Sequence, residues 1–247
     1  FTSASSRSTA FDGRTFLRTT EQQRYGLYAD FQFDYKNYLF LNLAARNDWT
    51  STLEDGHNSI LYPSVSASFV VTDAFTNLKS DALNFLKIRF GYGTSAGLGP
   101  IYGTRTIVDS NPRGFVDGTG AYSFHTVSNQ LGNRKLDPEL FNELELGFEA
   151  KFLKERISID FTAYDRSTKN LITNAPIDPA TGYSTTYLNL GKLSNKGIEI
   201  GLNATPLKLG AFQWDLTWNF TLVRPEVVTL SPDGSITQIV LAGFSDL

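Results

Sequence analysis

The residue whose neighbours best fit a catalytic motif is Ser95, in the segment Gly93–Gly97 (GTSAG). Glycines two residues before and after a serine form the G-x-S-x-G nucleophile elbow, whose serine attacks a carbonyl carbon. The elbow requires a helix directly after the serine, but Leu98-Gly99-Pro100 follows here and disfavours a helix. We therefore expect Gly93–Gly97 to be the exit of a strand into a loop. A secreted esterase or carbohydrate-binding domain that uses Ser95 is a remote alternative.

The two histidines, His57 and His125, are the next candidates for chemistry. His125 could serve Ser95 as a base, oriented by Asp109 or Asp117, but no alternation of strands and helices is present to build a hydrolase around them. Both histidines stand alone in polar stretches, so we expect them to be solvated. The chain has no cysteine, which excludes thiolate chemistry and cysteine-based zinc sites. We expect no cofactor, no metal and no enzymatic activity.

Three carboxylates, Glu143, Glu145 and Glu149, are separated by two and four residues. Calcium-binding loops also space acidic residues closely, but a strand places residues two apart on the same face. The apolar residues between these glutamates favour the strand. We expect the three side chains to form a solvated wall that faces charged neighbours.

The strand that carries these glutamates shows a period of two from Phe141 to Lys151 (FNELELGFEAK). Its even positions are mostly aliphatic or aromatic, and its odd positions are mostly charged. A strand of this kind has one face in an apolar medium and one in water.

The same pattern recurs along most of the chain and predicts eight amphipathic strands. They are Arg24–Tyr35, Tyr38–Trp49, Leu61–Val71, Phe85–Tyr92, Phe141–Lys151, Arg156–Arg166, Lys196–Thr205 and Phe212–Val223. Most contain about ten to twelve residues, and a tilted strand of that length rises about 25–30 Å, close to the thickness of the hydrocarbon layer.

The connections between the predicted strands alternate in length. Tight turns are expected at Lys36-Asn37 and at Leu153–Glu155, and long loops at about residues 93–140 and 167–195. Transmembrane barrels combine short turns on one side with long extracellular loops on the other, and aromatic residues near their strand ends. These features predict an all-β chain that forms part of one transmembrane antiparallel β-barrel domain over residues 1–247.

The composition agrees with this class. The 22 basic and 25 acidic side chains give a net charge of −3, so no basic surface suggests nucleic acid as a partner. No apolar run approaches the roughly 20 residues of a membrane-spanning helix. Charged side chains on the polar face would be costly inside a small dry core, whereas a wide, wet lumen holds them easily.

Several segments resemble the SusC/RagA-type TonB-dependent outer-membrane transporters of Bacteroidetes. The segments follow the order of that family and cover well over half of the chain: Tyr38–Leu53 (YLFLNLAARNDWTSTL), Leu61–Phe75 (LYPSVSASFVVTDAF), Leu83–Gly97 (LNFLKIRFGYGTSAG), Leu136–Ile172 and Gly182–Leu207.

The resemblance implies an active nutrient importer in the outer membrane of a Gram-negative cell, surrounded by lipid. Such a transporter is a 22-stranded barrel with an N-terminal plug. Its implied partners are a SusD-like surface lipoprotein and TonB with its inner-membrane motor proteins, and its cargo is an oligosaccharide or a peptide. The plug and the TonB-binding segment have no counterpart in these residues, so we expect the chain to be a section of such a barrel.

Residues that contact cargo or the lipoprotein are expected among aromatic and polar side chains of the long loops, because aromatic faces suit sugar rings and peptide side chains alike. The candidates are Tyr102, Arg105, Phe115, Tyr122, Phe124 and His125 in the first long loop, and Tyr183 and Tyr187 in the second. A passive porin-like or adhesive outer-membrane barrel is the alternative function.

Overall fold

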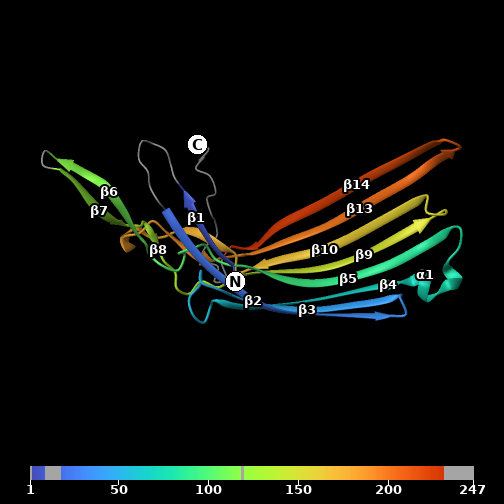
Figure 1. Ribbon diagram of the computed structural model, residues 1–247, viewed down its shortest axis with the longest axis horizontal. Coiled ribbons are helices and arrows are strands. Elements are labelled where there is room, and N and C mark those ends of the chain that lie inside the picture. The colour runs from blue at the N-terminus through green and yellow to red at the C-terminus, as the bar shows by residue number, and fades with distance from the viewer. Residues whose placement is uncertain (1, 9–17, 118–119, 231–247) are drawn as a thin grey trace.

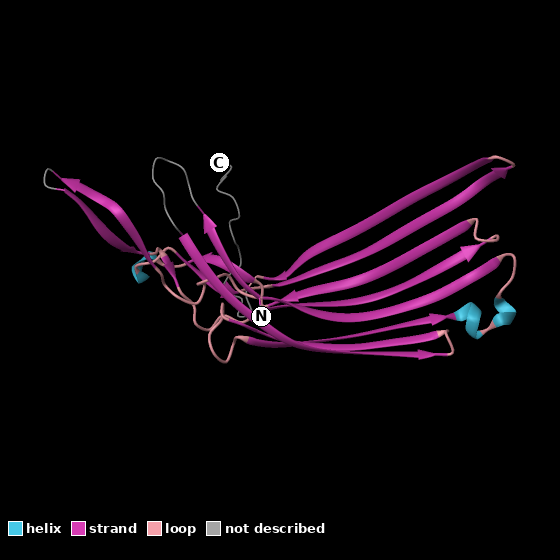
Figure 2. Cartoon of the chain, in the orientation of Figure 1, coloured by secondary structure: helices cyan, strands magenta, loops and turns pink. Residues whose placement is uncertain are grey.

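The computed structural model describes residues 2–8, 18–117 and 120–230. Nine strands form one antiparallel sheet, which carries the long strands of the molecule (Figures 1 and 2). In spatial order they are β1 (Thr2–Ser8), β2 (Arg18–Tyr35), β3 (Leu39–Thr50), β4 (Ser59–Val70), β5 (Leu83–Gly97), β9 (Glu139–Phe152), β10 (Ile157–Lys169), β13 (Lys192–Leu209) and β14 (Phe212–Thr229). The all-β antiparallel prediction is confirmed.

All eight predicted strands are present, and several are longer than predicted. One of the extensions on the C-terminal side is in β5, which was expected to end at Tyr92 but continues to Gly97, opposite Glu139 of β9. Alternation is lost over these last residues while the backbone hydrogen bonds continue, so the hydropathy pattern ends before the strand does. Strand β1 was not predicted.

Tight turns join the strands at the right-hand end of Figure 1. Lys36 and Asn37 both have positive φ, at 51° and 57°, and are the central residues of a tight turn in which the Tyr38 amide donates to the Tyr35 carbonyl oxygen. Two successive residues with positive φ match the twist of the flanking strands. Leu153, Lys154 and Glu155 also have positive φ and link β9 to β10. Both predicted turns are confirmed. The connection from β4 to β5 contains a helical turn, α1 (Val71–Ala74), and a 3-10 turn, η1 (Thr76–Leu78).

The sheet has two chemically different faces, set by its register. One row of paired residues on the apolar face runs across eight strands: Phe33, Leu41, Ala67, Phe90, Leu146, Ala163, Ile198 and Leu222. The adjacent row on the polar face is Gln32, Asn42, Ser66, Gly91, Glu145, Tyr164 and Gly197. Large apolar side chains on the first face are exposed, including Leu27 (72%) and Phe31 (60%).

The other end of the strands carries the longer connections, which contain further strands. β6 (Val108–Asp117) and β7 (Gly120–Val127) form a hairpin that projects away from the sheet in Figure 1. β11 (Ile172–Pro176), β12 (Thr185–Asn189) and β8 (Gln130–Leu131) form a small second sheet, and η2 (Pro179–Thr181) lies between β11 and β12. Residues 93–140, predicted as a long loop, therefore contain strands: β6 pairs with β7, and β8 pairs with β12.

The most deeply buried apolar side chains lie mainly in these connections and not in the strands of the large sheet. We call residues 51–58, 98–107, 128–138 and 170–191 the loop cluster. Leu136 is completely buried, and Leu53, Ala175 and Leu190 are at most 7% exposed. A Cβ on Gly99 would lie 3.1 Å from Leu53 Cδ2 and 3.2 Å from Leu136 Cδ2, so glycine favours this close packing.

No helix within the described ranges is both long and apolar enough to cross a membrane.

Candidate functional site

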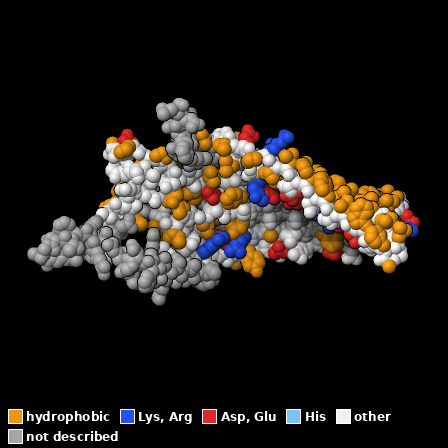
Figure 3. All heavy atoms as spheres, turned by 90° about the horizontal axis from the view of Figure 1, so that it is seen from above, with side chains coloured by type: hydrophobic (Ala, Val, Ile, Leu, Met, Phe, Trp, Pro, Cys, Tyr) orange, Lys and Arg blue, Asp and Glu red, His pale blue; other side chains and the backbone are white. Residues whose placement is uncertain are grey.

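The polar face of the sheet contains three adjoining hollows of about 470, 690 and 430 Å³. The first and second share Ser66, Gly91 and Glu145, and the first and third share Ser64 and Thr94. In the view of Figure 3, hydrophobic side chains gather at one end of the molecule and charged side chains lie nearer the centre. The hollows together make an extended, water-accessible surface and not one enclosed pocket.

The floor of this surface is formed by the smallest side chains of two neighbouring strands. Ser64 and Ser66 come from β4, while Gly91, Gly93 and Ser95 come from β5. Each occupies a polar-face position by register, for example Ser64 opposite Gly93 and Ser66 opposite Gly91. This floor was not singled out from the sequence, although small residues at polar-face positions of two consecutive strands are a readable signal.

Ser95 lies inside β5, opposite Phe141 of β9, and contributes to this floor. The strand continues to Gly97 after it, and no helix follows in the described residues up to Asp117. His125 lies on β7, which pairs with β6. The geometry is therefore not that of a nucleophile elbow, and the strand-exit interpretation of Gly93–Gly97 holds.

One part of the polar face, in and beside the hollows, forms a wall of paired charges. Lys87 Nζ lies 2.8 Å from Glu149 Oε2, and the guanidinium of Arg166 pairs with Glu143. The expectation that these glutamates face charged neighbours is confirmed for both. Such pairs keep the wall hydrophilic while leaving little net charge on it.

The longest-reaching side chain of this wall is Arg89. From β5 it crosses over Gly147 of β9 and binds Asp160 of β10 with two parallel hydrogen bonds of 2.9 and 2.7 Å. A Cβ on Gly147 would lie 2.7 Å from the carbonyl oxygen of Phe161 and 3.1 Å from Arg89 Nη2. Glycine at 147 therefore makes room for an ion pair that spans three strands.

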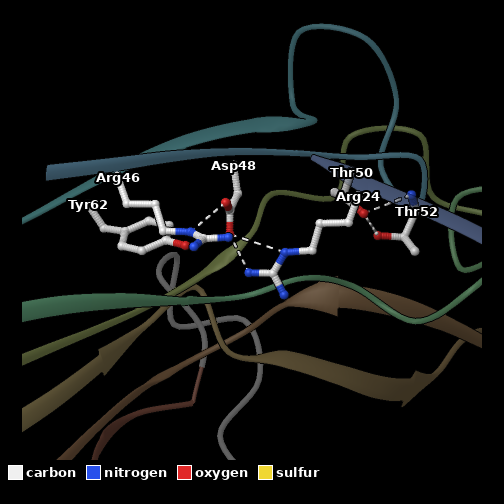
Figure 4. Close-up of polar contacts among 6 residues, drawn as sticks. All are labelled: Arg24, Arg46, Asp48, Thr50, Thr52 and Tyr62. Atoms are coloured by element: carbon white, nitrogen blue, oxygen red, sulfur yellow. Dashed lines mark hydrogen bonds and ion pairs between the residues drawn. The ribbon is translucent and has the colours of Figure 1, made fainter. Parts of the chain in front are cut away.

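A second polar centre is built around Asp48, near the end of β3 that leads into the loop cluster (Figure 4). Its carboxylate is completely buried and accepts hydrogen bonds from Arg24 Nε at 3.1 Å and Arg46 Nε at 2.7 Å, and from the hydroxyl of Tyr62. These partners come from β2, β3 and β4. Burial of a carboxylate is costly unless its oxygens are paired, and here both oxygens are.

The arrangement around Asp48 fixes three strands and leaves two cations partly in water. The side chains of Arg24 and Arg46 are 40% and 44% exposed, whereas that of Asp48 is 0% exposed. Next to it, the hydroxyls of Thr50 and Thr52 lie 2.9 Å apart, and both residues are buried. We interpret this centre as the link that holds the strand ends in place beneath the loop cluster.

Two of the predicted contact residues, Tyr102 and Arg105, lie in the loop cluster and border a further pocket of about 390 Å³. Arg105 forms an ion pair with Glu54, with Nη2 and Oε2 2.6 Å apart. The Arg105 guanidinium lowers the pKa of the Glu54 carboxyl, which stays ionised at neutral pH.

The two tyrosines predicted in the second long loop also lie in this cluster, where a Cβ on Gly103 would be 3.3 Å from Tyr187 Cδ2. The backbone carbonyl of Tyr187, on β12, accepts a hydrogen bond of 2.8 Å from Asn133. Tyr183 precedes β12 and is partly exposed. Tyr187 therefore contributes to the packing of the loops, and Tyr183 lies at their surface.

The other four predicted residues are on the projecting hairpin. Phe115 of β6 is opposite Tyr122 of β7, Asn111 is opposite Phe124, and Ser110 is opposite His125. The eight predicted residues are thus divided between the hairpin and the loop cluster. None of them is among the described residues that line the three hollows.

The expectation that His57 is an isolated, solvated histidine was wrong. Its Nδ1 lies 2.6 Å from Asp137 Oδ1, and Asp137 is 80 residues away in the sequence. The contact arises because packing of the loop cluster brings the β3–β4 connection beside the start of β9. Within the described ranges, no three His, Asp or Glu side chains lie close enough together to hold a metal ion.

Comparison with known protein families gives a match over residues 1–239 to the family described as TonB dependent receptor-like, beta-barrel. Among curated proteins, the chain is 27% identical over 209 residues to TonB-dependent receptor P39 of Formosa agariphila, covering 84% of this chain and 20% of that protein. It is 26% identical over 221 residues to TonB-dependent receptor SusC of Bacteroides thetaiotaomicron, covering 84% of this chain and 21% of SusC. The chain thus spans about a fifth of the length of these relatives.

Solved structures share the fold. A chain of the RagAB peptide importer in its "closed-closed" state superposes with a TM-score of 0.78 at 22% identity, covering 87% of this chain and 23% of that one. The outer membrane transporter YddB of Escherichia coli gives a TM-score of 0.63 at 18% identity, covering 87% of this chain and 26% of that one.

Proposed function

Because this chain belongs to the TonB-dependent receptor-like β-barrel family, we propose that it forms part of the wall of an active nutrient importer. The protein lies in the outer membrane. In this proposal the chain carries out no chemistry of its own, and its polar face lines the path that the cargo follows.

The observation that carries the proposal is the two-faced sheet. The apolar row from Phe33 to Leu222, whose largest rings and leucines are mostly exposed, suits lipid chains, and the polar row beside it suits water. A soluble sandwich would bury one of these faces against a second sheet, and the described residues contain no such layer. The hollows over Ser64 and Ser66 then belong to the lumen.

The two ends of the strands are assigned by their connections. We place the tight turns, such as Lys36-Asn37, on the periplasmic side and the loop cluster with the β6–β7 hairpin on the extracellular side. The long loops at about residues 93–140 and 167–195 are then extracellular.

The proposed partners are those of related importers. The resemblance to SusC and RagAB supports a SusD-like surface lipoprotein on the extracellular side and TonB, with its motor proteins, on the periplasmic side. The proposed cargo is an oligosaccharide or a peptide. The eight loop residues singled out above, Tyr102 among them, remain candidates for contacts with the cargo or the lipoprotein.

The decisive experiment compares uptake with and without TonB in a strain that carries the full-length parent gene. Radiolabelled oligosaccharide and peptide mixtures are supplied, and uptake is measured with the gene present or deleted. We expect gene-dependent uptake of one class of cargo that stops when TonB is removed. Gene-dependent uptake that persists without TonB would instead identify a passive porin-like barrel.

A matched pair of variants tests which face lines the path. Ser66→Trp fills the floor shared by two hollows, whereas Ala67→Trp places the same side chain on the apolar face. Uptake should fall severalfold in the first variant and stay close to wild type in the second. Both should keep the heat-dependent gel shift of a folded barrel. Equal uptake by the two variants would contradict the proposed lumen.

A further inference from the structure

A pocket of about 390 Å³ lies where the loop cluster meets the end of β3 and the part of β2 paired with it. It is separate from the three hollows of the polar face, because it shares no lining residue with them. Its lining combines aromatic rings from the strands with charged and amide groups from two loops. This combination defines a site that the proposed transport through the lumen does not use.

The floor of the pocket is aromatic. The rings of Tyr25 and Trp49 stack with centroids 5.1 Å apart and an interplanar angle of 12°. The two residues pair across β2 and β3, and Tyr25 is on the apolar face because it lies two residues before Leu27. Tyr102 of the loop cluster, 45% exposed, adds a third ring at the edge. Flat aromatic surfaces of this kind accept the C–H face of a pyranose ring.

The walls of the pocket are polar. Glu54 and Arg105 are held by their ion pair, and the amide of Asn58 donates to Asp55 Oδ1 at 3.3 Å. Carboxylate oxygens, an amide and a guanidinium together accept from and donate to ring hydroxyls. With two carboxylates and one guanidinium the walls carry a net negative charge, which disfavours a phosphate or an acidic group as the ligand.

The position of the pocket indicates where its ligand comes from. Tyr25 is the first and Tyr35 the last ring of the apolar series on β2, so Tyr25 lies at one boundary of the apolar band. In the orientation proposed above, this is the outer-leaflet boundary, at the level of lipid headgroups. A ligand that approaches from the apolar face reaches the pocket from the membrane and not from the lumen.

We propose that this pocket binds a neutral sugar ring in the headgroup of an outer-leaflet glycolipid, seated on Tyr25 and Trp49 and bordered by Tyr102, Glu54 and Asp55. The inference rests on the proposed orientation of the loops. It assigns the glycolipid a resident place at the barrel surface, separate from the cargo.

The test uses the full-length parent protein, purified in detergent and stripped of lipid. Binding of rough lipopolysaccharide whose outer core carries neutral hexoses is compared with binding of lipid A alone and of maltohexaose. We expect Trp49→Ala and Tyr102→Ala each to weaken lipopolysaccharide binding by about tenfold. Lipid A should bind more weakly than lipopolysaccharide and be insensitive to Tyr102→Ala.

Trp214→Ala is the matched control. Trp214 is likewise a tryptophan on the apolar face, 52% exposed, but it lies near the tight turn between β13 and β14, at the opposite end of the strands. Its loss should leave lipopolysaccharide binding within about twofold of wild type. The heat-dependent gel shift verifies that each variant is folded.

Three results would overturn the proposal: equal losses in Trp49→Ala and Trp214→Ala, lipid A binding as tight as lipopolysaccharide, or maltohexaose binding as tight with the same sensitivity to Tyr102→Ala. The first two would indicate general lipid contact, and the third a soluble glycan. Any of these three results, obtained while TonB-dependent uptake is intact, would refute this inference and leave the proposed function standing.

Discussion

The nine-stranded sheet, which we call the barrel wall or simply the wall below, and the loop cluster are stabilised in different ways. In the wall, large apolar side chains such as Leu146 (53% exposed) point away from the sheet, and the order comes from continuous backbone pairing. In the loop cluster the backbone pairing is short and irregular, but Leu136 is completely buried. The wall therefore depends on the medium around it, whereas the loop cluster has an apolar core like that of a small soluble domain.

The comparison is tested most strongly by removing the centre of that core. Leu136→Ala should destabilise the loop cluster by about 2–5 kcal/mol, because a cavity replaces a fully packed side chain. Limited proteolysis of the full-length protein should then cut residues 128–138 faster, with the gel-shift temperature of the barrel unchanged. Leu146→Ala is the control, since it removes the same side chain from the wall and should leave the loops resistant.

A charge on the apolar face tests the wall. Leu146→Arg should cost about 2–4 kcal/mol in a bilayer, because Leu146 lies within the apolar row that faces lipid. The measurement is the folding free energy in lipid vesicles under urea titration. In a soluble protein, an exposed leucine accepts arginine at little cost, so a neutral result would remove the basis of the comparison.

A substitution at a crowded glycine of the wall should have a smaller effect on stability. Gly147→Ala should cost about 1–3 kcal/mol, because the new methyl group would lie 2.7 Å from the Phe161 carbonyl oxygen and displace Arg89 from Asp160. Gly91→Ala is the control: its Cβ would meet Glu145 Cβ at 3.7 Å, an ordinary contact. A lower gel-shift temperature for the first variant and not for the second is the expected outcome.

The smallest effect concerns the pH dependence of the loop cluster. Arg105 lowers the pKa of Glu54 in the folded protein, so the pair contributes stability above the unfolded pKa of about 4.3 and loses it as the pH falls through the lower folded value. Protease resistance of the loops should be flat from about pH 6 to 8 and fall in more acidic solution. In Glu54→Gln this acid-dependent step should be reduced, and an identical acid profile in the variant would contradict the assignment.

The difference between the two regions also explains what could be predicted from the sequence. Alternation predicted the eight strands, their two faces and both tight turns, because a strand between lipid and water has a fixed period. It failed where that constraint ends, as in β5 beyond Tyr92 and in the loop cluster. The packing of Leu53, Leu136 and Gly99 depends on three separate segments, and no local pattern encodes it.

The polar centre around Asp48 was missed for a related reason. The place of Asp48 on the polar face follows from alternation. Its burial depends on Arg24, Arg46 and Tyr62, which the register of β2, β3 and β4 brings beside it. The predicted contact residues were chosen as loop aromatics and polar side chains, a criterion that found one side of the pocket at Tyr102 and Arg105.

The same criterion could not find the aromatic floor of that pocket. Tyr25 and Trp49 lie on strands, where their rings fit an interfacial aromatic belt equally well. Only the packing of the loop cluster against the strand ends distinguishes the two roles, and that packing has no signature in the sequence.

The parallel pairing of β8 with β12 has a consequence for the order of assembly. Thr186 Oγ1 donates to the carbonyl oxygen of Leu131 across 55 residues of sequence, and β9 and β10 lie between the two segments. Closing so large a loop is entropically unfavourable until the β9–β10 hairpin brings its ends together. The loop cluster is then a late structure in biogenesis, and its amides should gain protection from hydrogen exchange only after this hairpin has entered the growing barrel.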